Sequence, residues 1–120
     1  MDIELKENER IDDLEYKGLK IIQNTDGFCF GIDAVLLSDY AKEIKDNAKV
    51  LDLGTGTGIL SILLSRKTNL SKIYGIELQE EVAQMAKRSV KLNNLEDKVE
   101  IINKNIKDLG EIFEKIPSKQ

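Results

Sequence analysis

Residues 50–64 combine three features in an order that few folds accommodate. The apolar run Val50-Leu51 leads into D-L-G-T-G-T-G at residues 52–58, and a second apolar run follows at residues 59–64. Glycine permits positive φ values in a tight turn and removes the Cβ atoms that would keep a ligand away from the backbone. Backbone N–H groups at the beginning of the next helix then point at an electron-rich group. This pattern predicts a strand, a glycine-rich turn and a helix, with a cofactor at the turn.

The spacing of the glycines separates the types of glycine-rich loop. A P-loop requires Gly-Lys-Ser/Thr, whereas Gly58 is followed by Ile59 and Leu60. The dinucleotide fingerprint G-x-G-x-x-G would need its third glycine at Ile59. The pattern present, D-x-G-x-G-x-G, resembles motif I of class I S-adenosylmethionine-dependent methyltransferases. Asp52 suits the cationic parts of that cofactor, and the helix N-terminus suits its carboxylate. An ordinary turn that ends a strand is the alternative.

A second acid stands where the same architecture requires one. The apolar run at residues 72–76 reads as a buried strand, and Glu77 ends it about 20 residues after the glycine loop, as nucleotide-binding βαβ units prefer. A carboxylate at this place can accept hydrogen bonds from both ribose hydroxyls. Taken alone, Glu77 is equally compatible with a solvated acid or a helix cap, so its assignment depends on the glycine loop.

The chain from residue 50 onward alternates between strand and helix patterns. Strands are predicted at residues 50–53, 72–76 and 99–102, and helices at residues 59–66, 80–92 and 109–116. Right-handed crossovers would place the three strands in parallel, in the order third, second, first. The predicted fold is therefore α/β, a Rossmann-like class I methyltransferase fold truncated after the third strand.

The residues before this pattern form an N-terminal extension. Residues 1–18 are polar and read as partly ordered, whereas residues 19–23 and 28–30 are strand-like runs separated by a turn, which predicts a hairpin. Asp33 then precedes a helical stripe at residues 34–44. We expect residues 1–48 to be this extension and residues 49–120 to be the first half of the cofactor-binding domain.

Composition excludes several functions. The 120 residues are 41% hydrophobic and 33% charged with a net charge of −4, which is typical of a soluble globular chain and not of a strongly basic nucleic-acid surface. With one cysteine and no histidine, neither a disulfide within the chain nor a Cys/His metal site or catalytic pair can form. No signal peptide or run of apolar residues long enough to span a membrane is present. A cytoplasmic location without membrane or metal is expected.

Two further segments point to a subgroup of that family. Residues 27–37, G-F-C-F-G-I-D-A-V-L-L, resemble the segment before motif I in the bacterial tRNA adenine-N6 methyltransferases that modify valine tRNA, and residues 10–14 resemble their opening. The resemblance implies S-adenosylmethionine as cofactor, tRNA as partner and an adenine amine as methyl acceptor. The candidate cofactor-binding residues are Asp52, Gly54, Thr55, Gly56, Thr57, Gly58, Glu77, Leu78, Asn105 and Ile106.

Asn105 departs from the pattern of this family. An acid at the end of the third strand normally binds the adenine amino group of the cofactor, and the matching residue here is Asn105, followed by Ile106. Asparagine accepts and donates hydrogen bonds but supplies no charge. A turn residue is the alternative interpretation of Asn105.

The family's amine-binding motif, Asn-Pro-Pro-Tyr, is absent, because Pro117 is the sole proline. No catalytic residue is therefore assigned, and we expect these residues to be the inactive N-terminal part of a longer enzyme. The exposed edge of the strand at residues 50–53 would need a partner, in a homo-oligomer or in the missing half. Methylation of rRNA, a protein or a small molecule stays open, as do an NAD-binding Rossmann segment and a non-catalytic binding module.

Overall fold

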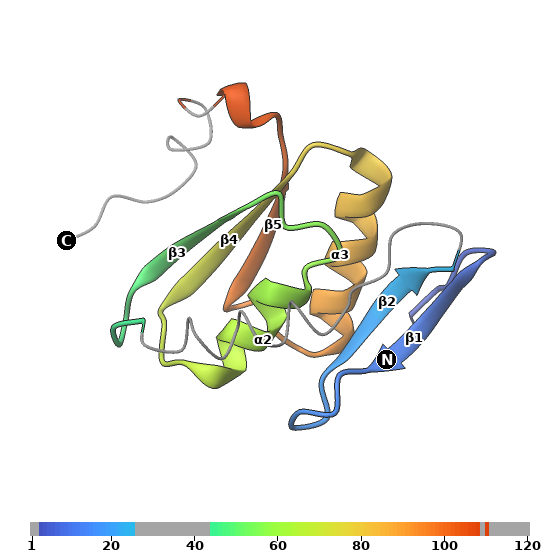
Figure 1. Ribbon diagram of the computed structural model, residues 1–120, viewed down its shortest axis with the longest axis horizontal. Helices are drawn as coiled ribbons and strands as arrows, with labels where there is room; N and C mark the ends of the chain where they lie inside the picture. Colours follow the sequence, from blue (N-terminus) through green and yellow to red (C-terminus); the bar gives the residue numbers. More distant parts are fainter. Residues whose placement is uncertain (1–2, 26–43, 109, 111–120) are drawn as a thin grey trace.

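The computed structural model describes residues 3–25, 44–108 and 110, and all structural statements below refer to them. They form a two-stranded hairpin, a three-stranded sheet and two helices (Figure 1). The elements in chain order are β1 (Glu9–Asp13), β2 (Lys20–Asn24), β3 (Lys49–Leu53), α2 (Ile59–Lys67), β4 (Lys72–Glu77), α3 (Glu80–Leu92), β5 (Val99–Asn103) and the short 3-10 helix η2 (Ile106–Asp108).

The three-stranded sheet confirms the predicted topology. Strands β3, β4 and β5 are parallel and lie in the order β3-β4-β5, with Asp52 opposite Gly75 and Glu77 opposite Asn103. This register brings the ends of β3 and β4 to the same edge of the sheet, where ligands of open α/β sheets bind. The fold is the predicted Rossmann-like α/β fold. The predicted helix at residues 109–116 lies outside the described residues.

Helix α3 has the predicted bounds, and its ends explain why. Glu80 and Glu81 occupy the first turn, where the helix dipole favours acids. Asn94 follows the helix in the left-handed conformation, with φ of 57°, whereas Asn93 has φ of −96°. Asn93 has another role, because its side chain is buried against β2.

The N-terminal hairpin exists, but its described strands are not the predicted pair. Strand β2 forms as expected, and β1 pairs with it antiparallel, with Ile11 opposite Ile22. The expectation that residues 1–18 are only partly ordered is therefore wrong for β1. Residues 28–30, Cys29 among them, and the helix predicted at residues 34–44 lie outside the described residues.

Helix α3 lies between the hairpin and the parallel sheet (Figure 1). Ser89 Oγ accepts a hydrogen bond from Ile22 N–H at 2.8 Å, and Asn93 both accepts from Lys20 N–H at 2.8 Å and donates to Lys20 C=O at 2.6 Å. Residues two apart on a strand and four apart on a helix are both about 6 Å apart. Ser89 and Asn93, four residues apart on α3, therefore reach the backbone groups of Ile22 and Lys20, two residues apart on β2.

One apolar core joins the hairpin, both helices and one face of the sheet. Leu14, Leu19 and Ile21 of the hairpin region are buried in the same cluster as Ile62 of α2 and Ala86 of α3. A smaller cluster on the other face of the sheet contains Tyr74, Ile76 and Ile102. The division of the chain at residue 48 stays a prediction, although the hairpin shares its core with the sheet. No helix in the described part of the chain has the length and apolar character needed to cross a membrane.

Candidate cofactor site

The glycine-rich turn between β3 and α2 adopts the conformation that its sequence predicts. Gly54, Gly56 and Gly58 have φ values of 71°, 58° and 85°, a region that side chains other than glycine rarely adopt. The N–H groups of Gly54 and Thr55 both donate to Ile76 C=O, at 2.8 and 2.9 Å. The turn is therefore anchored to the end of β4.

Asp52 stabilises the turn through hydrogen bonds of its side chain. Its Oδ2 accepts hydrogen bonds from Thr55 Oγ1 and from Ser61 Oγ, both at 2.8 Å. Burial raises the pKa of the Asp52 carboxyl, and the two hydroxyl donors only partly oppose that effect. Sequence reasoning missed Ser61, which is fully buried. A serine within the apolar run at residues 59–64 was the available signal, because a buried hydroxyl requires a partner.

Glu77 reaches the glycine turn from the end of β4. Its Oε1 accepts a hydrogen bond from Gly56 N–H at 2.9 Å, and its Oε2 accepts from Gln79 N–H at 3.0 Å. The structure thus brings together the two features that the sequence analysis combined, the acid at residue 77 and the loop at residues 54–58. Each carboxylate oxygen keeps acceptor capacity for a further donor.

Gly75 permits the close approach of the turn to β4. A Cβ atom at this position would lie 2.7 Å from Thr55 Oγ1 and 2.9 Å from Thr55 Cβ. Glycine is therefore required in the middle of this strand, where it is otherwise unfavourable. The sequence analysis did not assign this role to Gly75.

The remaining predicted residues follow β4 and β5. Leu78 and Ile106 are apolar side chains with exposed fractions of 61% and 43%. Asn105 Oδ1 accepts a hydrogen bond from Lys107 N–H at 2.9 Å, so its carbonyl caps the turn that begins η2. Asn103, which sequence reasoning missed, donates from Nδ2 to the carbonyls of Glu77 and Leu78, each at 2.9 Å. It fixes the loop that carries two predicted site residues.

A cavity of about 500 Å³ adjoins the glycine turn on the hairpin side. Gly56, Thr57 and Glu77 line it, whereas the other seven predicted residues do not. Its remaining walls come from α3, the loop before it and the N-terminal segment. These lining residues are Gln79, Glu81, Val82, Met85, Lys6, Glu7, Glu9 and Asn24.

Comparison with known proteins places this geometry in a family. Residues 38–116 match the model of the TRM5/TYW2 methyltransferase domain. A ribosomal protein L11 methyltransferase of Dictyoglomus thermophilum is 31% identical, over 92% of this chain and 41% of that protein. A tRNA1(Val) (adenine(37)-N6)-methyltransferase of Flavobacterium johnsoniae is 29% identical, over 60% of this chain and 31% of that protein. The chain thus spans less than half the length of these relatives.

Solved structures support the same fold. The structure of M. jannaschii TYW2 in complex with AdoMet superposes with a TM-score of 0.71, covering 88% of this chain and 47% of that chain at 21% sequence identity. At this identity the likeness concerns the fold, which is that of class I methyltransferases. Together with the family match over residues 38–116, it confirms the resemblance drawn from the glycine loop. The chain belongs to the TRM5/TYW2 methyltransferase domain family.

Proposed function

We propose that this chain forms the S-adenosylmethionine-binding part of a methyltransferase that acts on tRNA. The observation that carries the proposal is the contact of Glu77 Oε1 with Gly56 N–H at 2.9 Å. The contact brings a carboxylate beside a turn whose glycines leave the backbone open to a ligand, which supports ribose hydroxyls as its further donors. Family membership supports the proposal independently of this contact.

The residues of the site fit the parts of this cofactor. The carboxylate of Glu77 would hold the ribose hydroxyls, and the exposed side chains of Leu78 and Ile106 would contact the adenine ring. Gly58 begins α2 without a side-chain cap, which suits binding of the cofactor carboxylate at this N-terminus. Asp52 would act mainly on the turn, because Oδ2 already accepts from two hydroxyls.

S-adenosylmethionine supplies an electrophilic methyl group on a sulfonium, which transfers to a nucleophile by direct displacement. The residues described above bind and orient, and none is placed to act as a covalent intermediate. Because relatives of this chain include enzymes named for protein L11 and for tRNA, we infer that the choice of acceptor is made outside this cofactor region.

Titration calorimetry with S-adenosylhomocysteine tests the cofactor assignment. Each hydrogen bond to an ionised acceptor contributes about 1.5 to 3 kcal/mol, so Glu77→Ala should weaken binding at least about tenfold. Glu80→Ala removes an exposed acid three residues away and serves as the matched control. Equal affinity of the Glu77→Ala variant and the unmodified chain would remove Glu77 from the site. Tighter binding of NAD than of S-adenosylhomocysteine would contradict the choice of cofactor.

The acceptor needs its own experiment. The protein used comprises these 120 residues together with whatever the adjoining coding sequence encodes. It is incubated with labelled S-adenosylmethionine and with unmodified valine tRNA, ribosomal RNA or protein L11. We expect label at the N6 amine of an adenine in the tRNA. Label in ribosomal RNA or in protein L11 instead would refute tRNA as the substrate.

Two other expectations continue as proposals. Among the described strands, β3 pairs only with β4, and association of two copies through its other edge would appear as a dimer in size-exclusion chromatography with light scattering. A cytoplasmic location is consistent with a tRNA substrate and would be checked by fractionation of the cells that produce the protein.

A further inference from the structure

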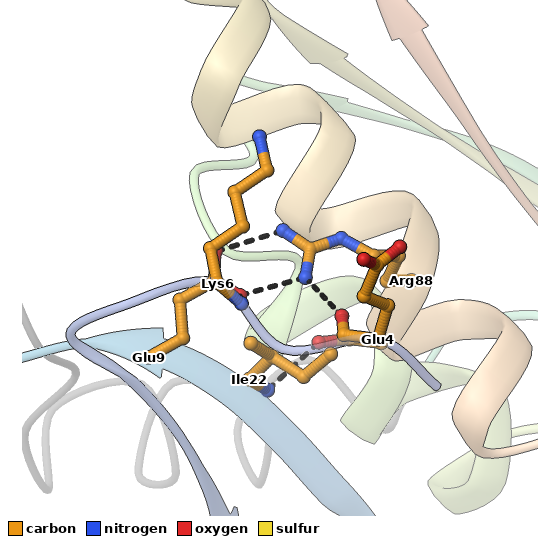
Figure 2. A network of polar contacts seen from close by, with 6 residues as sticks. Glu4, Lys6, Glu9, Ile22 and Arg88 are labelled. Carbon is orange, nitrogen blue, oxygen red and sulfur yellow. Dashed lines mark hydrogen bonds and ion pairs between the residues drawn. The ribbon is translucent and has the colours of Figure 1, made fainter. Parts of the chain in front are cut away.

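Arg88 joins helix α3 to the N-terminal segment through three hydrogen bonds. Its Nη1 and Nη2 donate to the two carboxylate oxygens of Glu9 at 2.7 and 2.8 Å, and Nη1 also donates to Glu4 C=O at 2.8 Å. Figure 2 shows the guanidinium facing Glu9 with the chain of Glu4 and Lys6 folded around it. This is a two-pronged ion pair, the geometry in which arginine binds carboxylates most strongly.

Glu9, one partner of the ion pair, lines the cavity that adjoins the glycine turn. Glu9 Oε1 also accepts from Lys6 N–H at 2.8 Å, so the carboxylate fixes the turn that precedes β1. Residues 6, 7 and 9 of this turn line the same cavity as Gly56, Thr57 and Glu77. Arg88 thereby connects the wall made by the N-terminal segment to the helix that follows the proposed ribose acid.

The hairpin has contacts with α3 and the core besides those of Arg88. Ser89 and Asn93 bind the backbone of β2, and Leu19 and Ile21 are buried in the common core. Residues 4–7 lie outside β1, and Leu5, at 42%, is among the more exposed large apolar side chains. The Arg88–Glu9 pair therefore acts on the wall segment more than on the fold.

The pair is also shielded from water. The side chain of Glu9 is 5% exposed and that of Arg88 21%. The hydrogen bonds from Arg88 lower the pKa of the Glu9 carboxyl, while Glu9 raises the pKa of the guanidinium. A shielded ion pair contributes little net stability because desolvation offsets the attraction, but it fixes geometry. Such a pair beside a cavity is better explained by positioning than by folding.

We propose that Arg88 is a positioning residue for the cofactor cavity: its paired contact with Glu9 holds in place the segment whose residues 6, 7 and 9 line the cavity together with Gly56 and Glu77. The inference rests on the proposed function, since it requires that the cavity takes part of S-adenosylmethionine. Glu9 and the wall precede residues 38–116, which match the family model.

The test measures the dissociation constant for S-adenosylhomocysteine in Arg88→Gln, Glu9→Gln and the double variant. If the wall is in place in only a tenth of the molecules without the pair, the apparent dissociation constant rises about tenfold. The double variant should bind no more weakly than either single variant, because both changes remove the same contact. Arg88→Lys keeps the charge and should restore part of the affinity. Lys20→Gln, which removes the exposed Lys20–Asp13 pair on the same hairpin, should leave affinity unchanged.

Amide exchange at Ile22 separates positioning from a general loss of structure. Its N–H is bound by the buried Ser89 hydroxyl, so protection of this amide in Arg88→Gln shows that the hairpin stays docked (Figure 2). Weaker binding with Ile22 still protected supports the inference. Unchanged affinity overturns it and leaves the proposed function standing, and loss of affinity together with loss of Ile22 protection overturns it in favour of a structural role. If the unmodified chain binds no S-adenosylhomocysteine, the proposed function fails first.

Discussion

Gly75→Ala should destabilise the protein by displacing the glycine turn. The new Cβ would lie 2.7 Å from Thr55 Oγ1, 2.9 Å from Thr55 Cβ and 3.0 Å from Ile101 Cδ1. Thr55 is buried, and its hydroxyl is bound to Asp52 Oδ2 at 2.8 Å, so it cannot move without losing that bond. The change therefore acts on the turn through one side chain.

The expected magnitude combines three effects. Overpacking costs about 1 to 3 kcal/mol. Loss of a hydrogen bond to a carboxylate costs about 1.5 to 3 kcal/mol. Replacement of glycine by alanine within a strand otherwise stabilises the fold by about 0.5 to 1 kcal/mol. The free energy of unfolding should thus fall by about 2 to 5 kcal/mol, which is a large part of the stability of a small domain.

Urea unfolding followed by circular dichroism measures this loss. Gly110→Ala is the control, because a Cβ there meets nothing within 4 Å and the backbone is not left-handed. In a Thr55→Gly background both contacts with residue 55 are gone, so Gly75→Ala should cost clearly less. An equal cost in both backgrounds, or a cost in the unmodified chain no larger than that of Gly110→Ala, would refute the reasoning.

The other predictions concern the turn and the loop after β4. Gly56→Val should abolish binding of S-adenosylhomocysteine in calorimetry while circular dichroism shows that helical content is retained. A Cβ at this position meets nothing within 4 Å, but φ of 58° is unfavourable for a β-branched residue. Outright unfolding would mean that the glycine serves only the turn. Since burial raises the pKa of Asp52 above its ordinary 3.8, its protonated form is favoured in the folded state, and this contribution to stability is lost as the pH rises through the folded pKa. Asp52→Asn should therefore gain stability relative to the unmodified chain as the pH rises above about 4, measured by urea unfolding without cofactor. A difference that stays constant with pH would contradict the assignment. Asn103→Asp removes both hydrogen bonds to the loop at residues 77–78 and should lower cofactor affinity, whereas Asn94→Asp, at an exposed position after α3, should not.

The parallel sheet could be predicted because each of its strands and helices is marked by residues within it or next to it. Apolar runs mark β4 and β5, and acids in the first turn and asparagines after the last turn mark α3. Strand β1 carried no such signal, since Ile11 is the one apolar residue in Glu-Arg-Ile-Asp-Asp. This strand is held by contacts distant in sequence, such as those between Glu9 and Arg88 and between Asp12 and Gln23.

The residues of the candidate site also fall into two groups, those that the sequence predicted and those that it did not. The spacing between the glycine loop and Glu77 predicted that the two would meet, because crossover units fix which strand ends lie side by side. The functions of Asn103, Gly75 and Arg88 depend on which groups each one meets in the folded chain. Neither residue type nor spacing carries that information.

The contact of Asn93 with Lys20 has a consequence for association between molecules. A side-chain amide that bonds both N–H and C=O of one residue imitates the peptide group of a neighbouring strand. Together with the Ser89 hydroxyl on Ile22 N–H, this amide shields β2 on the side away from β1 without a third strand, at an edge that could template pairing with another chain. Loss of that amide would leave most of the core intact and still convert the hairpin into a surface prone to intermolecular β-pairing, so aggregation and not unfolding would be the first sign of damage here.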